Sequence, residues 1–177
     1  MKRVAKFEKV SYEEFKKSIT DFYYDNFQIV LKDNEIQKFY DNIKLPKRAT
    51  MASAGYDFFN NTGVDLVITK GETYKIPTGI RCEMYLDWVL VIAPRSGLGF
   101  KYRLQLDNSL GIIDADYAYS DNEGHIFLKV TNDSKFEKTC TIEQKKAFAQ
   151  GIFLPYGITE DDDVKEIRNG GFGSTGK

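Results

Sequence analysis

The chain has few cysteines, a single histidine and no long hydrophobic run, and each shortage excludes a class of protein. Cys82 and Cys140 form no CxxC pair, so we expect both to be reduced and packed rather than joined in a disulfide framework or bound to metal. With His125 alone and no GxSxG motif, a serine–histidine–aspartate triad has almost nothing to build on. No apolar run approaches the roughly 20 residues of a membrane span. The first ten residues lack the apolar core of a signal peptide, and a cytoplasmic protein without membrane association is expected.

An excess of charge of one sign is also missing. The 25 Lys and Arg residues balance 26 Asp and Glu residues, for a net charge of -1. No global basic field therefore attracts nucleic acid, and any phosphate site must be local. At 177 residues, with 42% hydrophobic and 29% charged residues, the composition is that of a soluble globular protein, and no linker divides the chain into two domains.

The first 45 residues carry helical patterns. Ser11 with Glu14 three residues later is a capping-box pattern, which predicts the start of a helix. A second helical stretch places its large apolar side chains on one face, at Ile36, Phe39, Tyr40 and Ile43. A free-standing unit of about 45 residues would be marginal, so residues 1–45 are predicted to be a strand and helical extension docked on a main domain at 46–167. We expect its aromatic face to pack rather than to bind a ligand.

After Pro46 the pattern changes to short strands and turns. Residues 79–86 alternate, and their apolar face comprises Ile80, Cys82, Met84 and Leu86. The segments "WVLVIAP" ending at Pro94, "GHIFLKVTND" and "AFAQGIFLPY" are predicted as further strands, and His125 in the second is expected to be a strand residue rather than a catalytic base. Short strands between Gly, Asn and Asp clusters predict an antiparallel sandwich or barrel. The charged run at 160–166 is expected to be a solvated loop.

Three clusters can carry chemistry, and each has an ordinary structural alternative. Asp114 follows the apolar triple "GII", where it either closes a turn or serves a site. "PRSGLG" combines a guanidinium, a hydroxyl and an approachable backbone, which suits a phosphate oxygen, although a turn with a surface arginine explains it too. The C-terminal "GGFGSTGK" is too rich in glycine to hold a helix or strand by itself. It is either a disordered tail or an arm that orders over a bound nucleotide.

Taken in order, five segments resemble the five motifs of the trimeric dUTP diphosphatases, the dUTPases. They are "SAGYDFF" (53–59), "APRSGLG" (93–99), "NSLGIIDADY" (108–117), "AFAQ" (147–150) and "GGFGSTGK" (170–177). The resemblance covers residues 45–177. It implies a mostly β fold, a distorted jelly-roll of the β-clip type, and a homotrimer with active sites between subunits. It also implies that a flexible C-terminal arm, residues 168–177, reaches over a neighbour's site.

The resemblance also implies residue roles. Asp114 matches the catalytic general base that activates the water attacking the α-phosphorus of dUTP, since carboxylates are ionised at neutral pH. Asn108, Gly111 and Ile112 match the segment that binds uracil, and Tyr117 matches the tyrosine under the deoxyribose, which leaves no room for a ribose 2'-hydroxyl. The matches to phosphate-binding and base-stacking positions are Arg95, Ser96, Gly97, Gln150, Arg168, Phe172, Gly173, Ser174 and Thr175.

Mg²⁺ is the implied cofactor. We expect the triphosphate itself to hold the ion, with no direct protein ligand; Asp57 matches an aspartate that either orients water around the ion or braces the site. Asp116 is expected to be structural or solvent-facing.

The chain departs from the family pattern at several points. Lys145 replaces a turn glycine and Ala147 replaces an arginine in the fourth motif. Arg168 stands one residue closer to "GGFG" than usual, which weakens its assignment to the γ-phosphate. Residues 118–123, "AYSDNE", are inserted after Tyr117, where the family usually turns at once.

Two other functions stay open beside the dUTP diphosphatase. One is a dCTP deaminase-like enzyme of the same fold, although its glutamate base has no match in "NSLGIIDADY". The other is a regulatory homologue that binds a protein partner through the N-terminal extension.

Overall fold

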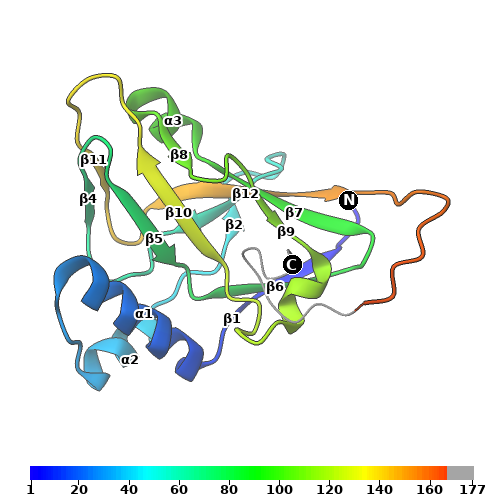
Figure 1. Ribbon diagram of the computed structural model, residues 1–177, viewed down its shortest axis with the longest axis horizontal. Helices are drawn as coiled ribbons and strands as arrows, with labels where there is room; N and C mark the ends of the chain where they lie inside the picture. The colour runs from blue at the N-terminus through cyan, green and yellow to red at the C-terminus, as the bar shows by residue number, and fades with distance from the viewer. Residues whose placement is uncertain (167–177) are drawn as a thin grey trace.

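The computed structural model describes residues 1–166 and builds them mainly from short strands (Figure 1). The elements in chain order are β1 (Ala5–Lys9), α1 (Tyr12–Phe27), α2 (Asp33–Asp41), β2 (Lys47–Arg48), β3 (Tyr56–Phe59), β4 (Leu66–Ile68), β5 (Thr73–Pro77), β6 (Ile80–Met84), β7 (Trp88–Pro94), α3 (Ser96–Tyr102), β8 (Leu104–Leu106), β9 (Gly111–Ile113), the 3-10 helix η1 (Ala115–Tyr119), β10 (Phe127–Asn132), β11 (Cys140–Ile142) and β12 (Ala147–Pro155).

The strands form one larger sheet and three smaller ones. The larger sheet has the order β2-β3-β12-β7-β9, and β5-β10-β8 form a second sheet. The remaining strands pair as β1-β6 and β11-β4. Every strand pairing in the described chain is antiparallel. This architecture confirms the predicted mostly β, jelly-roll class.

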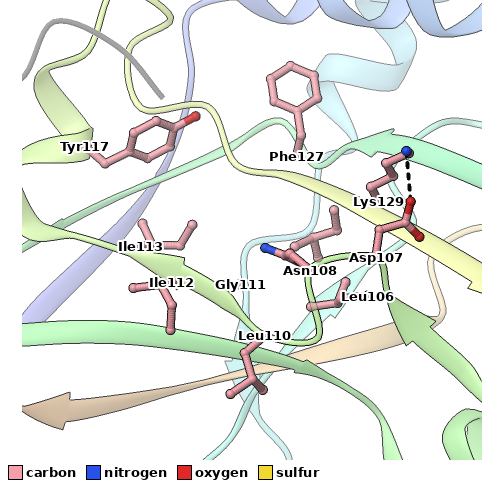
Figure 2. Close-up of a pocket in the computed structure, with 11 residues that line it drawn as sticks. Leu106, Asp107, Asn108, Leu110, Gly111, Ile112, Ile113, Tyr117, Phe127 and Lys129 are labelled. Carbon is pink, nitrogen blue, oxygen red and sulfur yellow. Dashed lines mark ion pairs between the residues drawn. The ribbon is translucent and has the colours of Figure 1, made fainter. Parts of the chain in front are cut away.

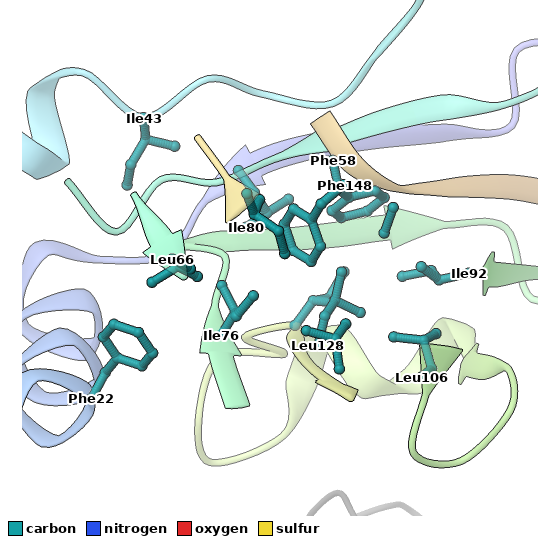
Figure 3. Close-up of a cluster of buried hydrophobic side chains, with 14 of the residues drawn as sticks. Phe22, Ile43, Phe58, Leu66, Ile76, Ile80, Ile92, Leu106, Leu128 and Phe148 are labelled. Atoms are coloured by element: carbon teal, nitrogen blue, oxygen red, sulfur yellow. The ribbon is translucent and has the colours of Figure 1, made fainter. Parts of the chain in front are cut away.

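The hydrophobic core lies between the five-stranded and the three-stranded sheet (Figure 3). Phe58, Ile92 and Phe148 come from the first sheet, and Ile76 and Leu128 come from the second. All five side chains are buried. Since successive strand residues face opposite sides of a sheet, Lys75 and Lys129, the neighbours of Ile76 and Leu128 on the second sheet, point away from the core and are exposed.

The N-terminal segment shares this core. Phe22 of α1 and Ile43, which follows α2, belong to the same buried cluster (Figure 3). The apolar face predicted for the second helix is confirmed, because Ile36 and Ile43 are buried and the two aromatic residues between them pack against the core. β1 adds an antiparallel partner to β6.

The predicted capping box at α1 is half wrong. Ser11 is the N-cap, and its hydroxyl accepts the Glu14 N–H at 3.2 Å, as the pattern predicts. The reciprocal bond is absent, because the N–H of Ser11 donates to Glu123 at 2.7 Å. The Glu14 carboxylate is turned instead towards His125.

Two strand boundaries differ from the sequence pattern. Leu86 is 75% exposed rather than inward, because β6 ends at Met84 and the chain turns there, with the Trp88 N–H bonded to the Tyr85 carbonyl at 3.0 Å. β10 begins at Phe127, so His125 precedes the strand. Both cysteines are buried free thiols, as expected.

Lys145 stands in the turn before β12, at the position where the fourth motif of the family pattern has a glycine. Its backbone keeps the left-handed conformation, with φ of 61°, that favours glycine. Its Nζ donates to the carbonyl of Asn42 at 2.8 Å. The turn is therefore tied to the end of the second helix.

Residues 160–166 are exposed without regular structure, as expected. Across residues 1–166 no helix is long and apolar enough to span a membrane.

Candidate active site

A cavity of about 300 Å³ lies between β9 and β10 (Figure 2). The lining side chains are Leu106, Asp107, Asn108, Leu110, Gly111, Ile112, Ile113, Tyr117, Phe127, Leu128 and Lys129. Four residues singled out from the sequence thus line one cavity, namely Asn108, Gly111, Ile112 and Tyr117. β10 forms the wall opposite β9.

Tyr117 is held rigidly at one end of this cavity. Its side chain is only 4% exposed, and its hydroxyl donates to the carbonyl of His125 at 2.8 Å. The same hydroxyl accepts from Nδ2 of Asn122 at 2.9 Å. The polar end of the ring is anchored behind the cavity, so the ring itself forms part of the wall (Figure 2).

β9 brings backbone to the cavity surface. Among residues 1–166 it has a strand partner on one side only, β7, with Gly111 opposite Ile92. A Cβ at Gly111 would lie 3.3 Å from the Cβ of Ile92, which is tighter than ordinary packing, so glycine suits this close pairing.

Asp114 lies where β9 ends. It is partly exposed and is the residue before η1, and its carbonyl accepts the Tyr117 N–H at 3.2 Å. Within residues 1–166 its side chain makes no capping hydrogen bond to η1. N-capping of η1, one form of the turn-closing alternative, is therefore not observed for Asp114 in the described part of the chain.

The far wall contains residues that the sequence analysis missed. Lys129 and Asp107 form an ion pair at 2.9 Å (Figure 2). Thr131 donates a hydrogen bond to Asp107. Burial raises the pKa of Asp107, but the bonds from Thr131 and Lys129 outweigh it and leave that pKa below its ordinary value. Phe127 lines the same cavity. The available signal was the alternation in "HIFLKV", which places Phe127 and Lys129 on one face of the strand.

A second polar cluster joins three other predicted residues. Gln150 on β12 lies opposite Asp57 on β3 and opposite Ala93 on β7. The Arg95 guanidinium contacts Asp57 through Nε at 3.3 Å, and its backbone N–H bonds to the Phe148 carbonyl at 3.0 Å. Sequence positions from three motifs thus meet at the end of β7.

Ser96 and Gly97 extend this second cluster. They form the first turn of the short helix α3, a segment predicted as a turn, and are exposed together with Arg95. The first N–H groups of a helix have no partner within it. A hydroxyl, a guanidinium and open backbone N–H groups therefore face solvent at one place.

Asp114 and Arg95 lie toward opposite ends of β7. Ile113, the residue before Asp114, pairs with Leu90, whereas Arg95 follows the last residue of the strand. From Leu90 to Arg95 the chain advances five positions, or about 16 Å at about 3.3 Å per residue. Within one chain the backbones of Asp114 and Arg95 are therefore well separated along β7.

His125 lies behind the cavity rather than in it. Its side chain is fully buried, so it has no access to a substrate. The sequence expectation that it is not a catalytic base agrees with this burial.

Several expectations fall outside the described part of the chain or need a metal. Arg168, Phe172, Gly173, Ser174 and Thr175 lie outside residues 1–166. Within that range no group of three or more His, Cys, Asp or Glu side chains could hold a metal ion. Asp57 is the carboxylate of the second cluster, and it contacts a guanidinium.

Comparison with known proteins identifies the family. The dUTPase family model matches residues 41–176. A deoxyuridine 5'-triphosphate nucleotidohydrolase of Lactococcus lactis subsp. lactis is 40% identical over 137 residues, which cover 76% of this chain and 89% of the relative. The enzyme of the same name from Tolumonas auensis is 37% identical over 139 residues, covering 75% and 87%.

Solved structures agree. The dUTPase of Streptococcus mutans superposes with a TM-score of 0.56 at 36% identity, covering 66% of this chain and 88% of that one. A dUTPase of Staphylococcus bacteriophage 80alpha with dUPNHPP gives a TM-score of 0.61 over 99% of this chain and 100% of that one; at 21% identity it supports the fold alone. Because the family model covers most of the chain and curated relatives exceed one third identity, the chain belongs to the dUTPase family.

Proposed function

We propose that the protein hydrolyses dUTP to dUMP and pyrophosphate. The observation that carries this proposal is the cavity between β9 and β10, which gathers Asn108, Gly111, Ile112 and Tyr117 beside Asp114. Its volume of about 300 Å³ suits a nucleoside rather than a macromolecule.

The cavity has the chemistry that a uracil and a deoxyribose require. The backbone of β9 offers N–H and C=O groups along its unpaired side, and Asn108 adds an amide at the same wall. Such groups complement the donors and acceptors of a pyrimidine edge. The fixed ring of Tyr117 is proposed to lie under the sugar, where a rigid surface rejects an additional hydroxyl.

Asp114 is proposed to activate the attacking water. Its carboxylate takes a proton as the water oxygen bonds to the α-phosphorus, and the bond from that phosphorus to the bridging oxygen of pyrophosphate breaks. Its position directly after β9 supports this role, because the same short segment binds the base and presents the carboxylate.

The second cluster is proposed to grip the triphosphate. Arg95 supplies forked charged donors, Ser96 a hydroxyl, and Ser96 and Gly97 the first N–H groups of α3. Gln150 adds an amide next to Asp57. Mg²⁺ would arrive on the phosphate oxygens and neutralise their charge, and Asp57 is placed to orient its water. A dUTPase from phage phi11 of S. aureus, 18% identical to this chain, coordinates a structural Mg(II) ion in its solved structure.

We also propose a homotrimer with shared sites, as is typical of the family. The reason lies in the distance of about 16 Å along β7, at about 3.3 Å per residue, between Arg95 and Leu90, the partner of the residue before Asp114. A general base must lie within hydrogen-bonding reach of the water it activates. Asp114 of one chain and Arg95 of another chain can then act on one substrate.

The deaminase alternative is less well supported. That chemistry uses a glutamate beside the pyrimidine, whereas the carboxylate among the cavity-lining residues is Asp107, which is engaged by Lys129. Ammonia release from dCTP would support the alternative.

The test is pyrophosphate release from dUTP, dCTP and dTTP with Mg²⁺. We expect hydrolysis of dUTP, and we expect kcat/KM for dCTP and for dTTP to be lower by about tenfold to a hundredfold. Asp114→Asn should abolish the activity, and Asp116→Asn, two positions along the chain, is the matched control. Full activity of Asp114→Asn would refute the assigned base, and no hydrolysis of dUTP would refute the function.

A further inference from the structure

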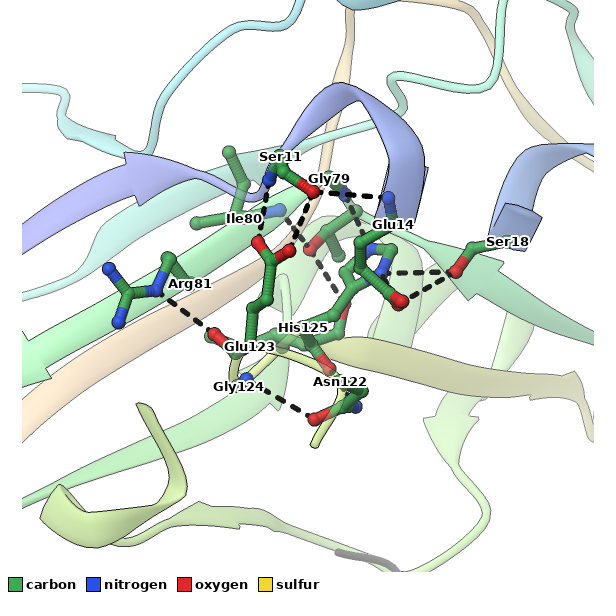
Figure 4. Close-up of polar contacts among 12 residues, drawn as sticks. Ser11, Glu14, Ser18, Gly79, Ile80, Arg81, Asn122, Glu123, Gly124 and His125 are labelled. Atoms are coloured by element: carbon green, nitrogen blue, oxygen red, sulfur yellow. Dashed lines mark hydrogen bonds and ion pairs between the residues drawn. The ribbon is translucent and has the colours of Figure 1, made fainter. Parts of the chain in front are cut away.

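The N-terminal extension holds the turn at residues 122–125 at two points (Figure 4). The backbone N–H and the hydroxyl of Ser11 donate to the Glu123 carboxylate at 2.7 and 2.6 Å. Three residues later Glu14 accepts a hydrogen bond from Nδ1 of His125 at 3.0 Å. Residues outside the family-matched segment thus clamp a turn that includes the end of the insertion after Tyr117.

Both ring nitrogens of His125 are engaged (Figure 4). The Gly79 N–H donates to Nε2 at 2.9 Å, so Nε2 carries no proton, and the neutral ring carries its proton on Nδ1 towards Glu14. Ser18 donates to the same Glu14 oxygen at 3.0 Å. Burial lowers the pKa of His125, in agreement with a neutral ring. The imidazole is therefore fixed in position as well as in tautomer.

The same turn fixes Tyr117. The tyrosine hydroxyl donates to the carbonyl of His125 and accepts from Asn122. Arg81 bridges the two ends of the segment 118–123. Its guanidinium donates to the carbonyl of Ala118 at 3.0 Å and to that of Glu123 at 2.9 Å. A shift of the turn would carry the tyrosine hydroxyl with it.

We infer that Glu14 and Glu123 are positioning residues for Tyr117, and that through them the extension sets the preference for a deoxyribonucleotide over a ribonucleotide. The inference rests on the proposed function, in which the Tyr117 ring lies under the sugar. The Tyr117 ring excludes a 2'-hydroxyl only if it cannot move away from the sugar. If the ring can shift by about 1 Å, the site no longer distinguishes deoxyribose from ribose. The two contacts with the extension supply this rigidity.

The experiment compares kcat/KM for dUTP and UTP in Glu14→Ala and Glu123→Ala. We expect the ratio of dUTP to UTP to fall by about fivefold or more, the change that corresponds to one lost hydrogen bond. The loss should come from faster reaction with UTP and a higher KM for dUTP, with little change in kcat for dUTP. Glu14→Gln should retain most of the preference, because its amide oxygen still accepts the Nδ1 proton.

Two control variants separate positioning from general stability. Glu13→Ala changes an exposed acid on the adjacent position of α1. Ile19→Val weakens the packing of the same helix without touching the turn, because Ile19 is fully buried in the core. Both should keep the wild-type ratio, and Ile19→Val should do so despite a lower Tm.

Hydrogen–deuterium exchange gives a readout independent of activity. Peptides covering residues 115–126 should exchange faster in Glu14→Ala than in Ile19→Val. Unchanged exchange, or a dUTP to UTP ratio equal to that of Ile19→Val, would overturn the inference. If the wild-type chain fails to hydrolyse dUTP, the proposed function and the nucleotide preference fail, whereas altered exchange would still establish the contact between the extension and the Tyr117 turn.

Discussion

Glu14 and His125 meet at 3.0 Å although they are 111 positions apart in the chain. The carboxylate lies on the first turn of α1, and the imidazole lies just before β10. Burial raises the pKa of Glu14, but the hydrogen bonds from His125 and Ser18 outweigh it and leave that pKa below its ordinary value. A charged carboxylate and a neutral imidazole therefore face each other in the interior.

The pH dependence of stability should report this pair. Burial lowers the pKa of His125 against the opposing effect of Glu14 and Glu123, and Lys75 disfavours protonation as well. The unfolded state, with an ordinary pKa of about 6.5, then binds the proton first. The free energy of unfolding should fall as pH drops below about 6.5, by up to about 1.4 kcal/mol per pH unit. The stabilisation from Glu14 should be lost only at more acidic pH, below about 4.5.

The measurement is urea denaturation between pH 7.5 and pH 5. His125→Gln is the comparison, because its amide can engage both Gly79 and Glu14 but does not titrate. Since the chain has one histidine, a slope present in the wild type and lost in this variant belongs to His125. If the wild type and His125→Gln have equal slopes, His125 binds its proton as readily in the folded state as in the unfolded state.

Gly124 should be intolerant of a side chain. Its φ is +72°, and an added Cβ would lie 2.6 Å from the Cα of Ala118 and 2.7 Å from the carbonyl oxygen of Tyr117. Gly124→Ala is expected to lower the free energy of unfolding by about 3 kcal/mol or more and to weaken nucleotide binding. Gly71 has a similar φ of +82° with open space around it, so Gly71→Ala should cost only about 1–2 kcal/mol. Equal losses in the two variants would mean that the turn can move aside.

Complementation should reveal the shared site. Trimers of Arg95→Ala chains alone, or of Asp114→Asn chains alone, are expected to be inactive. Trimers formed from equal amounts of both should recover about a quarter of wild-type activity. Each shared site then has a chance of about one half of an intact Asp114 and about one half of an intact Arg95. Mixing Arg95→Ala with Gln150→Ala should recover nothing, since those two residues belong to one cluster of one chain. Recovery in both mixtures, or in neither, would contradict the proposed division of the site.

The cysteines should be unreactive in the folded protein. Burial raises the pKa of Cys82 to about 12 and that of Cys140 to about 11. Because the thiolate is the reactive form, a disulfide reagent at pH 8 should label neither residue until the protein is unfolded, when both should react. Labelling of one cysteine at the unfolded rate would show that its strand opens.

Local features of the fold were predictable from the sequence. The N-cap at Ser11 depends on residues within one helical turn, and the strand ending at Pro94 depends on an apolar run and a proline. The order of the motifs placed Asn108 and Tyr117 together because the family's fold brings that segment to one site. Such features need no knowledge of distant partners.

Other features depended on tertiary contacts. The role of Glu14 was mispredicted, because Glu123 competes for the N–H of Ser11 from more than one hundred positions away. Phe127 and Lys129 were missed because only the pairing of β10 with its neighbours decides which cavity they face. The separation of Asp114 from Arg95 required the register of β9 on β7.

β9 is a three-residue strand at the edge of the larger sheet. Exposed strand edges are templates on which other polypeptides add and aggregate. A strand of this length, walled by β10 across the cavity, offers too little backbone for another chain but enough for one planar ring. In the proposed enzyme the uracil would take the place of a neighbouring strand, and the same short edge that admits a base would protect the sheet from aggregation.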